Sequence, residues 1–237
     1  MKRIKTLTIL LAAAITAIML NACGSNVFGE KINEGVITYK LDADGSSTSN
    51  NLAAILPEQM TMTFKDNNTL MTIKGYAGCF VLNAIANDSQ KKSYMTLSIG
   101  FNQKYMLVAD FGEKPFGTEI MSDLKITNTT DTMSICGYLC HKSIGHSDQC
   151  NRNFTFWYTK DIKITSDCII SPIKTIDGVV MAFDVEMFGI YMQAKAIEVN
   201  RTEVSDDTFE KPEGFNEVSR KELEDVIHTF DGSKKES

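Results

Sequence analysis

The 237-residue chain has only four prolines, and it contains no internal repeat, no low-complexity tract and no proline-rich linker. With 43% hydrophobic and 23% charged residues, its composition is that of a globular protein. This excludes a disordered chain, a collagen-like fibre and a protein that crosses a membrane many times. Acidic residues outnumber basic ones, so the net charge is −6. Without the three basic residues among the first 22, the net charge is −9. Nucleic acids are bound through basic surfaces, so we expect no nucleic-acid partner.

Catalytic motifs are missing as well. The sequence has no glycine-rich phosphate loop, no Gly-x-Ser-x-Gly and no His-Glu-x-x-His. Acidic residues gather at Asp206, Asp207, Glu222, Glu224 and Asp225, but no basic or nucleophilic residue accompanies them. Such groups are typical of a solvated face. We therefore expect a protein that is not an enzyme and that carries no cofactor.

The N-terminus carries the strongest pattern in the sequence. Lys2, Arg3 and Lys5 precede an uncharged apolar run of fourteen residues from Leu7 to Leu20. A membrane-spanning helix needs about 20 such residues, so this run is too short to span and is typical of a signal peptide. We predict a cleaved signal peptide over residues 1–22.

The end of this run resembles the lipobox of bacterial lipoproteins, with Leu20, Asn21 and Ala22 in front of Cys23. The resemblance implies that Cys23 carries palmitate-type acyl chains and anchors the protein to a membrane, with residues 23–33 as a tether. Ordinary secretory cleavage after Ala22 is the alternative. Residue 24 is glycine and no acidic run follows Cys23, which favours the outer membrane and an orientation toward the periplasm.

Alternating residues predict a mainly β (α+β) domain over residues 34–230, followed by a disordered tail over 231–237. Asp66, Asn67 and Asn68 supply turn chemistry between two strands, which predicts a hairpin. About eleven short strands are expected, in a highly curved antiparallel sheet or half-barrel. The expected strands cover residues 36–41, 60–65, 69–74, 79–86, 93–100, 104–110, 123–129, 133–142, 152–160, 178–187 and 190–199.

Short helices are expected to cover the open side of the sheet. Residues 51–56 precede a proline and predict a helical turn. Nearer the C-terminus, Ser219 and Glu222 form a capping-box pattern. Leu223, Ile227 and Phe230 follow at helical spacing, so this helix must cover an apolar surface.

Methionine is abundant, with twelve in the chain, and most of those in the mature part fall in predicted strands. Methionine is flexible and polarisable, so it suits an adaptable surface that binds an apolar or lipid-like ligand. The alternative is that these residues fill a solid core, as would suit a structural or protein-interaction lipoprotein without a ligand. Candidate cavity-lining residues are Met60, Met62, Met71, Met95, Met106, Trp157, Met181, Phe183, Met187 and Met192.

Five cysteines other than Cys23 leave an odd number for pairing in an exported protein. Cys136 and Cys140 are too far apart to bridge if both lie on one strand, at about 13 Å. Cys140 and Cys150 flank a polar segment, 141–149, that we expect to be a loop. The interpretation is a Cys140–Cys150 disulfide, with Cys168 as the rival partner. The spacing of Cys136, Cys140, His141, His146 and Cys150 fits no zinc or haem pattern, so no metal is expected.

Several phrases in the second half resemble a family of exported bacterial domains: residues 136–142 (CGYLCHK), 156–162 (FWYTKDI), 177–179 (DGV) and 204–215 (VSDDTFEKPEGF). This order is similar to an uncharacterised family in the lipoprotein-carrier superfamily, which has the LolA/LolB-like fold. The resemblance implies a half-barrel closed by short helices that shelters lipid chains. Cys136 and Cys150 depart from the family pattern, and no residue matches a carrier's lipid-transfer hook.

Overall fold

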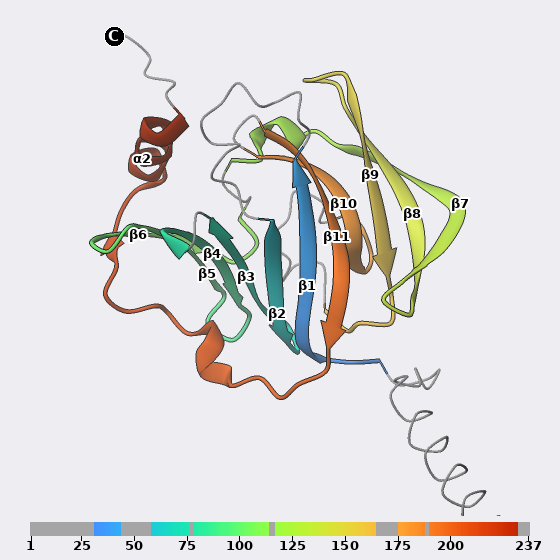
Figure 1. Ribbon diagram of the computed structural model, residues 1–237, viewed down its shortest axis with the longest axis horizontal. Helices are drawn as coiled ribbons and strands as arrows, with labels where there is room; N and C mark the ends of the chain where they lie inside the picture. The colour runs from blue at the N-terminus through green and yellow to red at the C-terminus, as the bar shows by residue number, and fades with distance from the viewer. Residues whose placement is uncertain are drawn as a thin grey trace, which may run out of the picture. The chain divides into compact units, whose positions relative to one another are not determined.

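The computed structural model describes residues 31–43, 58–75, 78–113, 117–164, 175–187 and 190–231, which belong to one compact unit (Figure 1). Most of them lie in one sheet. Its strands are β1 Glu34–Ala43, β2 Gln59–Lys65, β3 Asn68–Gly75, β4 Phe80–Asn87, β5 Lys92–Ile99, β6 Gln103–Asp110, β7 Lys125–Ile135, β8 Tyr138–Ser147, β9 Arg152–Thr159, β10 Val179–Met187, β11 Ile190–Asn200 and β12 Asn216–Glu217.

Two runs of hairpin-connected strands meet at the centre of this sheet. Its order is β12-β6-β5-β4-β3-β2-β1-β11-β10-β9-β8-β7. Strands β1 and β11 join the two runs over a long antiparallel register, from Val36 opposite Asn200 to Ala43 opposite Met192. The expected mainly β class is confirmed, and the short β12 makes the sheet mixed because it runs parallel to β6.

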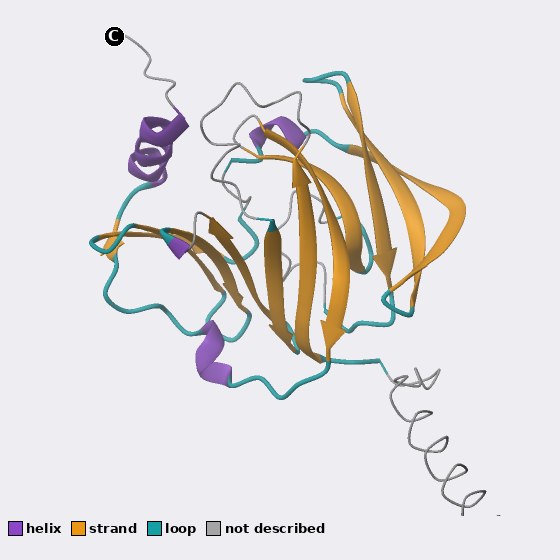
Figure 2. Cartoon of the chain, viewed as in Figure 1, coloured by secondary structure: helices purple, strands orange, loops and turns teal. Residues whose placement is uncertain are grey.

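The sheet bends strongly, and Figure 2 shows its strands sweeping around the interior of the domain. The pairing of β1 with β11 shifts register between Thr38 and Tyr39, with the extra residue on β11. The pairing of β10 with β9 shifts between Val180 and Ala182, with the extra residue on β10. A third lies in β7, where residues 128–132 are opposite a shorter stretch of β8. Bulges of this kind increase the twist of a strand and re-aim its side chains. They add to the bend of the single sheet around its core.

Helix α2, Arg220–Asp231, covers one end of the sheet next to β6. The predicted capping box is confirmed, since the Ser219 N–H donates to Glu222 Oε2 at 2.7 Å and the Glu222 N–H donates to Ser219 Oγ at 3.3 Å. Leu223 and Ile227 are buried against Met95, Leu97 and Leu107. Two 3₁₀ turns, η3 Glu119–Met121 and η5 Asp206–Phe209, cover other parts of the sheet.

The predicted strand over residues 133–142 is wrong. A tight turn at Cys136 and Gly137 separates β7 from β8, and both residues have positive φ, 50° and 82°. Two successive positive φ values fit the twist of a two-residue hairpin. The sequence hides this turn because cysteine stands where asparagine or aspartate would signal it. The predicted loop over 141–149 is also wrong. Because β8 begins after this turn, it continues to Ser147.

The structure also contradicts the Cys140–Cys150 disulfide. Cys79, Cys136, Cys140 and Cys150 are all free thiols. Cys140 lies near the start of β8, while Cys150 lies beyond its end at Ser147. Seven residues of extended strand place the two at least about 20 Å apart, against a limit of about 7 Å for a disulfide. The rival partner, Cys168, lies outside the described residues.

The predictions for residues 1–30, which include the signal peptide, Cys23 and most of the tether, lie outside the described residues, as do those for 51–56 and 232–237. Within the described part of the chain, no helix has the length and apolar character needed to cross a membrane.

Candidate functional site

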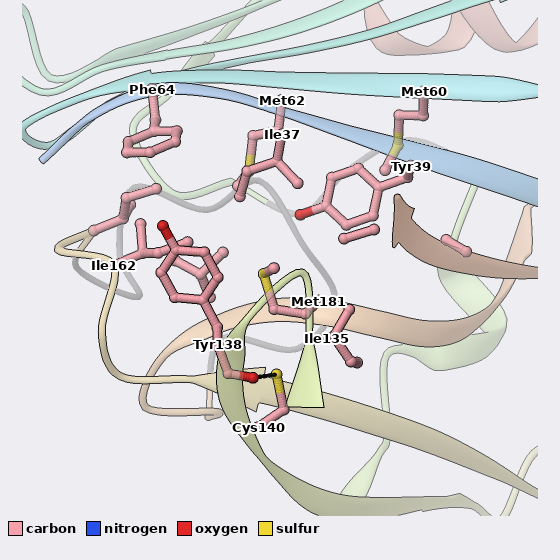
Figure 3. Close-up of a cluster of buried hydrophobic side chains, with 14 of the residues drawn as sticks. Ile37, Tyr39, Met60, Met62, Phe64, Ile135, Tyr138, Cys140, Ile162 and Met181 are labelled. Atoms are coloured by element: carbon pink, nitrogen blue, oxygen red, sulfur yellow. Dashed lines mark hydrogen bonds between the residues drawn. The ribbon is translucent and has the colours of Figure 1, made fainter. Parts of the chain in front are cut away.

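The largest buried cluster lies between the β1–β2 pair and the tip of the β7–β8 hairpin (Figure 3). Strand alternation places Ile37 opposite Met62 and Tyr39 opposite Met60, so these four side chains share one face. Figure 3 shows Tyr138 and Cys140 on the other side of the cluster. The Tyr39 hydroxyl donates to the carbonyl of Val180 at 3.0 Å and links β1 to β10. We call the face of the sheet that carries Tyr39 and Met60 the inner face.

The candidate cavity-lining residues do not gather at one point. Met60, Met62 and Met181 belong to the largest cluster, with Met71 and Trp157 packed against it. Met192 belongs to a second cluster on β9–β11, and Phe183 and Met187 contact both. Met95 lies under α2. Met106 lies in a fourth cluster with Val204 and Phe209, on the opposite face of its strand, so its assignment to a common lining is wrong.

Exposure separates these residues into two groups. Met60, Met62, Met95, Met106, Met181 and Met192 are 0–4% exposed. A side chain that borders a space large enough for water would keep accessible surface, so these six are enclosed by protein atoms. Met71, Phe183 and Met187 keep partial exposure on the inner face, and Phe80 does so near α2. At these four positions a ligand could contact the inner face without displacing the core. Ala84, Ile99 and Tyr105 are also partly exposed on this face, around the cluster under α2.

Trp157, the one tryptophan of the chain, lies on the other face of β9 from the buried Phe154 and Phe156. Its cross-strand neighbours are Lys142 and Ala182. Lys142 Nζ lies 5.6 Å from the centre of the indole ring, within the range of a cation–π interaction. The structure therefore makes Trp157 a partly buried boundary residue rather than part of the inner face.

Ionisation is disfavoured inside the largest cluster. Burial raises the pKa of Tyr39, with smaller contributions from Cys136 and Cys140. Burial also raises the pKa of Cys140 to about 11. A thiol with this pKa is protonated at neutral pH and is a poor nucleophile and metal ligand. The face thus suits neutral, apolar molecules.

The histidines and cysteines that lie close together in the sequence, at residues 136–150, do not converge in the structure. Cys136 Sγ lies 3.3 Å from the carbonyl oxygen of Ala196, whereas Cys140 lies in the core. His146 Nδ1 lies 2.8 Å from Asn153 Oδ1. Across the described residues, no group of three metal-ligating side chains converges.

Sequence reasoning missed the aromatic part of the inner face and the segment that covers it. Phe154 and Phe156 are fully buried in the second cluster, and Met121 from η3 is packed against them. The alternation of Phe154, Phe156 and Tyr158 along β9 was a usable signal. Met121 gave none, because it lies in a short turn outside the sheet and reaches the face only through tertiary contacts.

Asp123 fastens the segment that carries Met121. The Ser147 hydroxyl lies 2.7 Å from Asp123 Oδ1, and the backbone N–H groups of Asp148 and Gln149 donate to Oδ2 at 2.9 and 3.2 Å. The hydrogen bond from Ser147, followed by those from the backbone of Gln149 and Asp148, lowers the pKa of Asp123 below its ordinary value of 3.8.

This lowered pKa makes the attachment sensitive to acid. A depressed carboxyl pKa contributes stability above the unfolded pKa, and this contribution disappears as the pH falls through the folded pKa. We expect amide hydrogen exchange of residues 118–124, corrected for intrinsic rates, to accelerate between about pH 5 and pH 2.5. Asp123→Asn should exchange fast throughout this range. An acid-insensitive wild-type segment would contradict the expectation.

Comparisons with known proteins bear on the fold. No protein-family model matches the chain, and no curated protein matches it. Among solved structures, PNGF-II in two crystal forms aligns with 82% of the chain at a TM-score of 0.53 and 16% identity. The chain corresponds to about a third of the length of PNGF-II, 32% in one crystal form and 33% in the other. At this identity the likeness concerns the fold alone.

Weaker likenesses are found with two mycobacterial proteins. The lipoprotein LppX of Mycobacterium tuberculosis has 11% identity and a TM-score of 0.33, over 74% of this chain and 90% of LppX. LprF of Mycobacterium bovis has 10% identity and a TM-score of 0.30, over 76% and 90%.

Proposed function

We propose that this protein is a lipoprotein of the bacterial cell envelope, anchored through Cys23, that holds an apolar or lipid-like ligand against the inner face of its sheet. The anchor rests on the lipobox-like residues 20–23, and outer-membrane attachment facing the periplasm rests on Gly24 and the lack of an acidic run. The observation that supports a ligand is the partial exposure of Met71, Phe183 and Met187 beside the buried Tyr39, Met60 and Met62 of the same face.

Physical chemistry explains why these positions suit an apolar ligand. The Phe183 ring meets the Tyr39 ring edge-on, with ring centroids 5.9 Å apart, and so presents an ordered aromatic surface. Methionine side chains adapt to the shape of a neighbour because they are unbranched and polarisable. The raised pKa values of Tyr39 and Cys140 show that this interior disfavours a charged group. A hydrocarbon chain bound here would bury its apolar surface, and it would not leave any buried polar group without a hydrogen-bond partner.

The direct test is native mass spectrometry of the acylated protein extracted from membranes, which should reveal a lipid in addition to the chains on Cys23.

A binding assay then uses the full chain with Cys23→Ala and cis-parinaric acid, whose fluorescence is excited by energy transfer from Trp157. Phe183→Asp should weaken binding by at least about tenfold, because it places a charge on the apolar face. The matched control is Leu139→Asp, at a side chain that is 52% exposed. Equal affinities for the two variants would refute the proposed face.

A second candidate is a structural or interaction lipoprotein with a solid core and no ligand. The enclosure of six methionines at 0–4% exposure favours it. In this case a partner would meet exposed parts such as Leu139 or the β8–β9 turn at residues 148–151 rather than the inner face. Absence of both a copurifying lipid and parinaric acid binding, together with capture of a protein on the β8–β9 turn, would select this candidate.

A further inference from the structure

A short segment covers the aromatic half of the inner face. We call residues 118–124, which include η3, the clasp. Met121 at its centre is 0% exposed and is clustered with Phe154, Phe156, Val185, Ile190 and Met192. Ile120 and Leu124, on either side of it, are partly buried against the same cluster. The clasp therefore separates a ready-made apolar surface from solvent.

Polar contacts to the β8–β9 turn, and one to β10, hold the clasp in place. Asp123 accepts the backbone N–H groups of Asp148 and Gln149, as described above. The Ser147 hydroxyl lies 2.7 Å from Asp123 and 3.0 Å from the carbonyl of Ile120, so it can donate to either. Gln149 Nε2 donates to Ser122 Oγ at 3.4 Å, and the N–H of Glu186 donates to Met121 Sδ at 3.3 Å.

This mode of attachment differs from that of helix α2, which also covers part of the sheet. Helix α2 has its own hydrogen-bonded backbone and buries both Leu223 and Ile227. The clasp has a single 3₁₀ turn, lies outside the sheet and has one fully buried hydrophobic side chain, Met121. Elements held by few buried apolar contacts open at the lowest free-energy cost. Opening of the clasp would leave the hydrogen-bonded strands intact.

We infer that the clasp is the gate to the aromatic half of the inner face: release of Asp123 from the β8–β9 turn withdraws Met121 and exposes Phe154, Phe156 and Met192 to a ligand that reaches them past Phe183 and Met187. This inference rests on the proposed function, because a gate requires a ligand. It adds the route of entry and assigns Asp123 and Ser147 to holding the gate shut.

Loosening the clasp is the first test. Asp123→Asn keeps the size of the side chain but removes its charge, so stopped-flow association of cis-parinaric acid with the Cys23→Ala chain should accelerate by about tenfold, the factor that one charge-assisted hydrogen bond supplies. The matched control is Asp110→Asn, because Asp110 at the end of β6 forms an exposed ion pair with Lys92 of β5. Equal association rates for the two variants would overturn the gate.

Locking the clasp is the second test. Ser122→Cys and Gln149→Cys place two thiols at a contact that already exists. Cys23→Ala, Cys79→Ser, Cys136→Ser, Cys150→Ser and Cys168→Ser remove the other thiols except that of the buried Cys140. A short bis-maleimide should bridge them, and N-ethylmaleimide on the same protein is the unbridged control. Bridging should reduce the association rate at least tenfold while far-UV circular dichroism stays unchanged. Binding at the same rate in both samples would overturn the gate and leave the proposed function standing. Loss of binding in both samples and in the unlabelled chain would overturn both proposals.

Discussion

Replacing Phe156 by alanine is expected to lower the free energy of unfolding by about 3–5 kcal/mol. Its ring is 0% exposed in the second cluster, next to the clasp residue Met121. A Cβ atom built on Gly145 in the neighbouring strand would lie 3.0 Å from this ring, so the ring occupies space that only a glycine leaves open. Alanine would leave a cavity that the paired strands β8 and β9 cannot close. Urea denaturation followed by far-UV circular dichroism measures the loss.

Phe101→Ala is the matched control, because this side chain is 94% exposed in the turn between β5 and β6. Its substitution should change stability by less than about 0.5 kcal/mol. Similar losses for the two variants would mean that Phe156 is not packed in the protein in solution. The affinity of Phe156→Ala for parinaric acid can be measured as well, since a cavity at this place enlarges the apolar space under the clasp.

Gly35→Ala should destabilise the protein by about 3 kcal/mol or more. Gly35 has a φ of 150°, and a Cβ atom there would lie 2.5 Å from the carbonyl oxygen of Asn200. This oxygen belongs to the backbone of β11, so the clash cannot be relieved by rotating a side chain. It also falls where β1 and β11 join the two halves of the sheet. The expected result is a large drop in the midpoint of thermal or urea unfolding.

The control for Gly35 separates backbone strain from the clash. Gly214 has a φ of 77°, but a Cβ atom there would meet nothing within 4 Å. Gly214→Ala therefore carries only the conformational cost, about 1–2 kcal/mol. If both variants lost the same stability, close approach of Gly35 to β11 would not be the cause.

Local patterns predicted the parts of the fold that depend on neighbours in the chain. The hairpin at Asp66 and Asn67 formed as expected between β2 and β3, because the turn chemistry and the alternation of both strands agree. The C-terminal helix formed as predicted from its capping box and its apolar spacing. Each of these features needs contacts over only a few residues.

Predictions that depended on an unrecognised turn were wrong. Cys136 with Gly137 makes a two-residue hairpin that no common turn signal announces, and this one error moved the ends of two strands. The error also created the predicted disulfide, since Cys140 and Cys150 flank a loop only if β8 ends early. One unrecognised turn thus changed both the topology and the chemistry expected of the cysteines.

The sequence by itself determined the alternation that makes this chain a β protein and the apolar stripe of its last helix, while the signal peptide over residues 1–22 stays a prediction. These are local properties, and each can be read from side-chain periodicity or from a short motif. Only the tertiary structure decided which methionines share the inner face, that Met106 lies on the other side, and that Met121 covers Phe154 and Phe156. The reason is that strand pairing over long separations, bulges that re-aim side chains and the polar attachment of the clasp bring together residues that no local pattern connects.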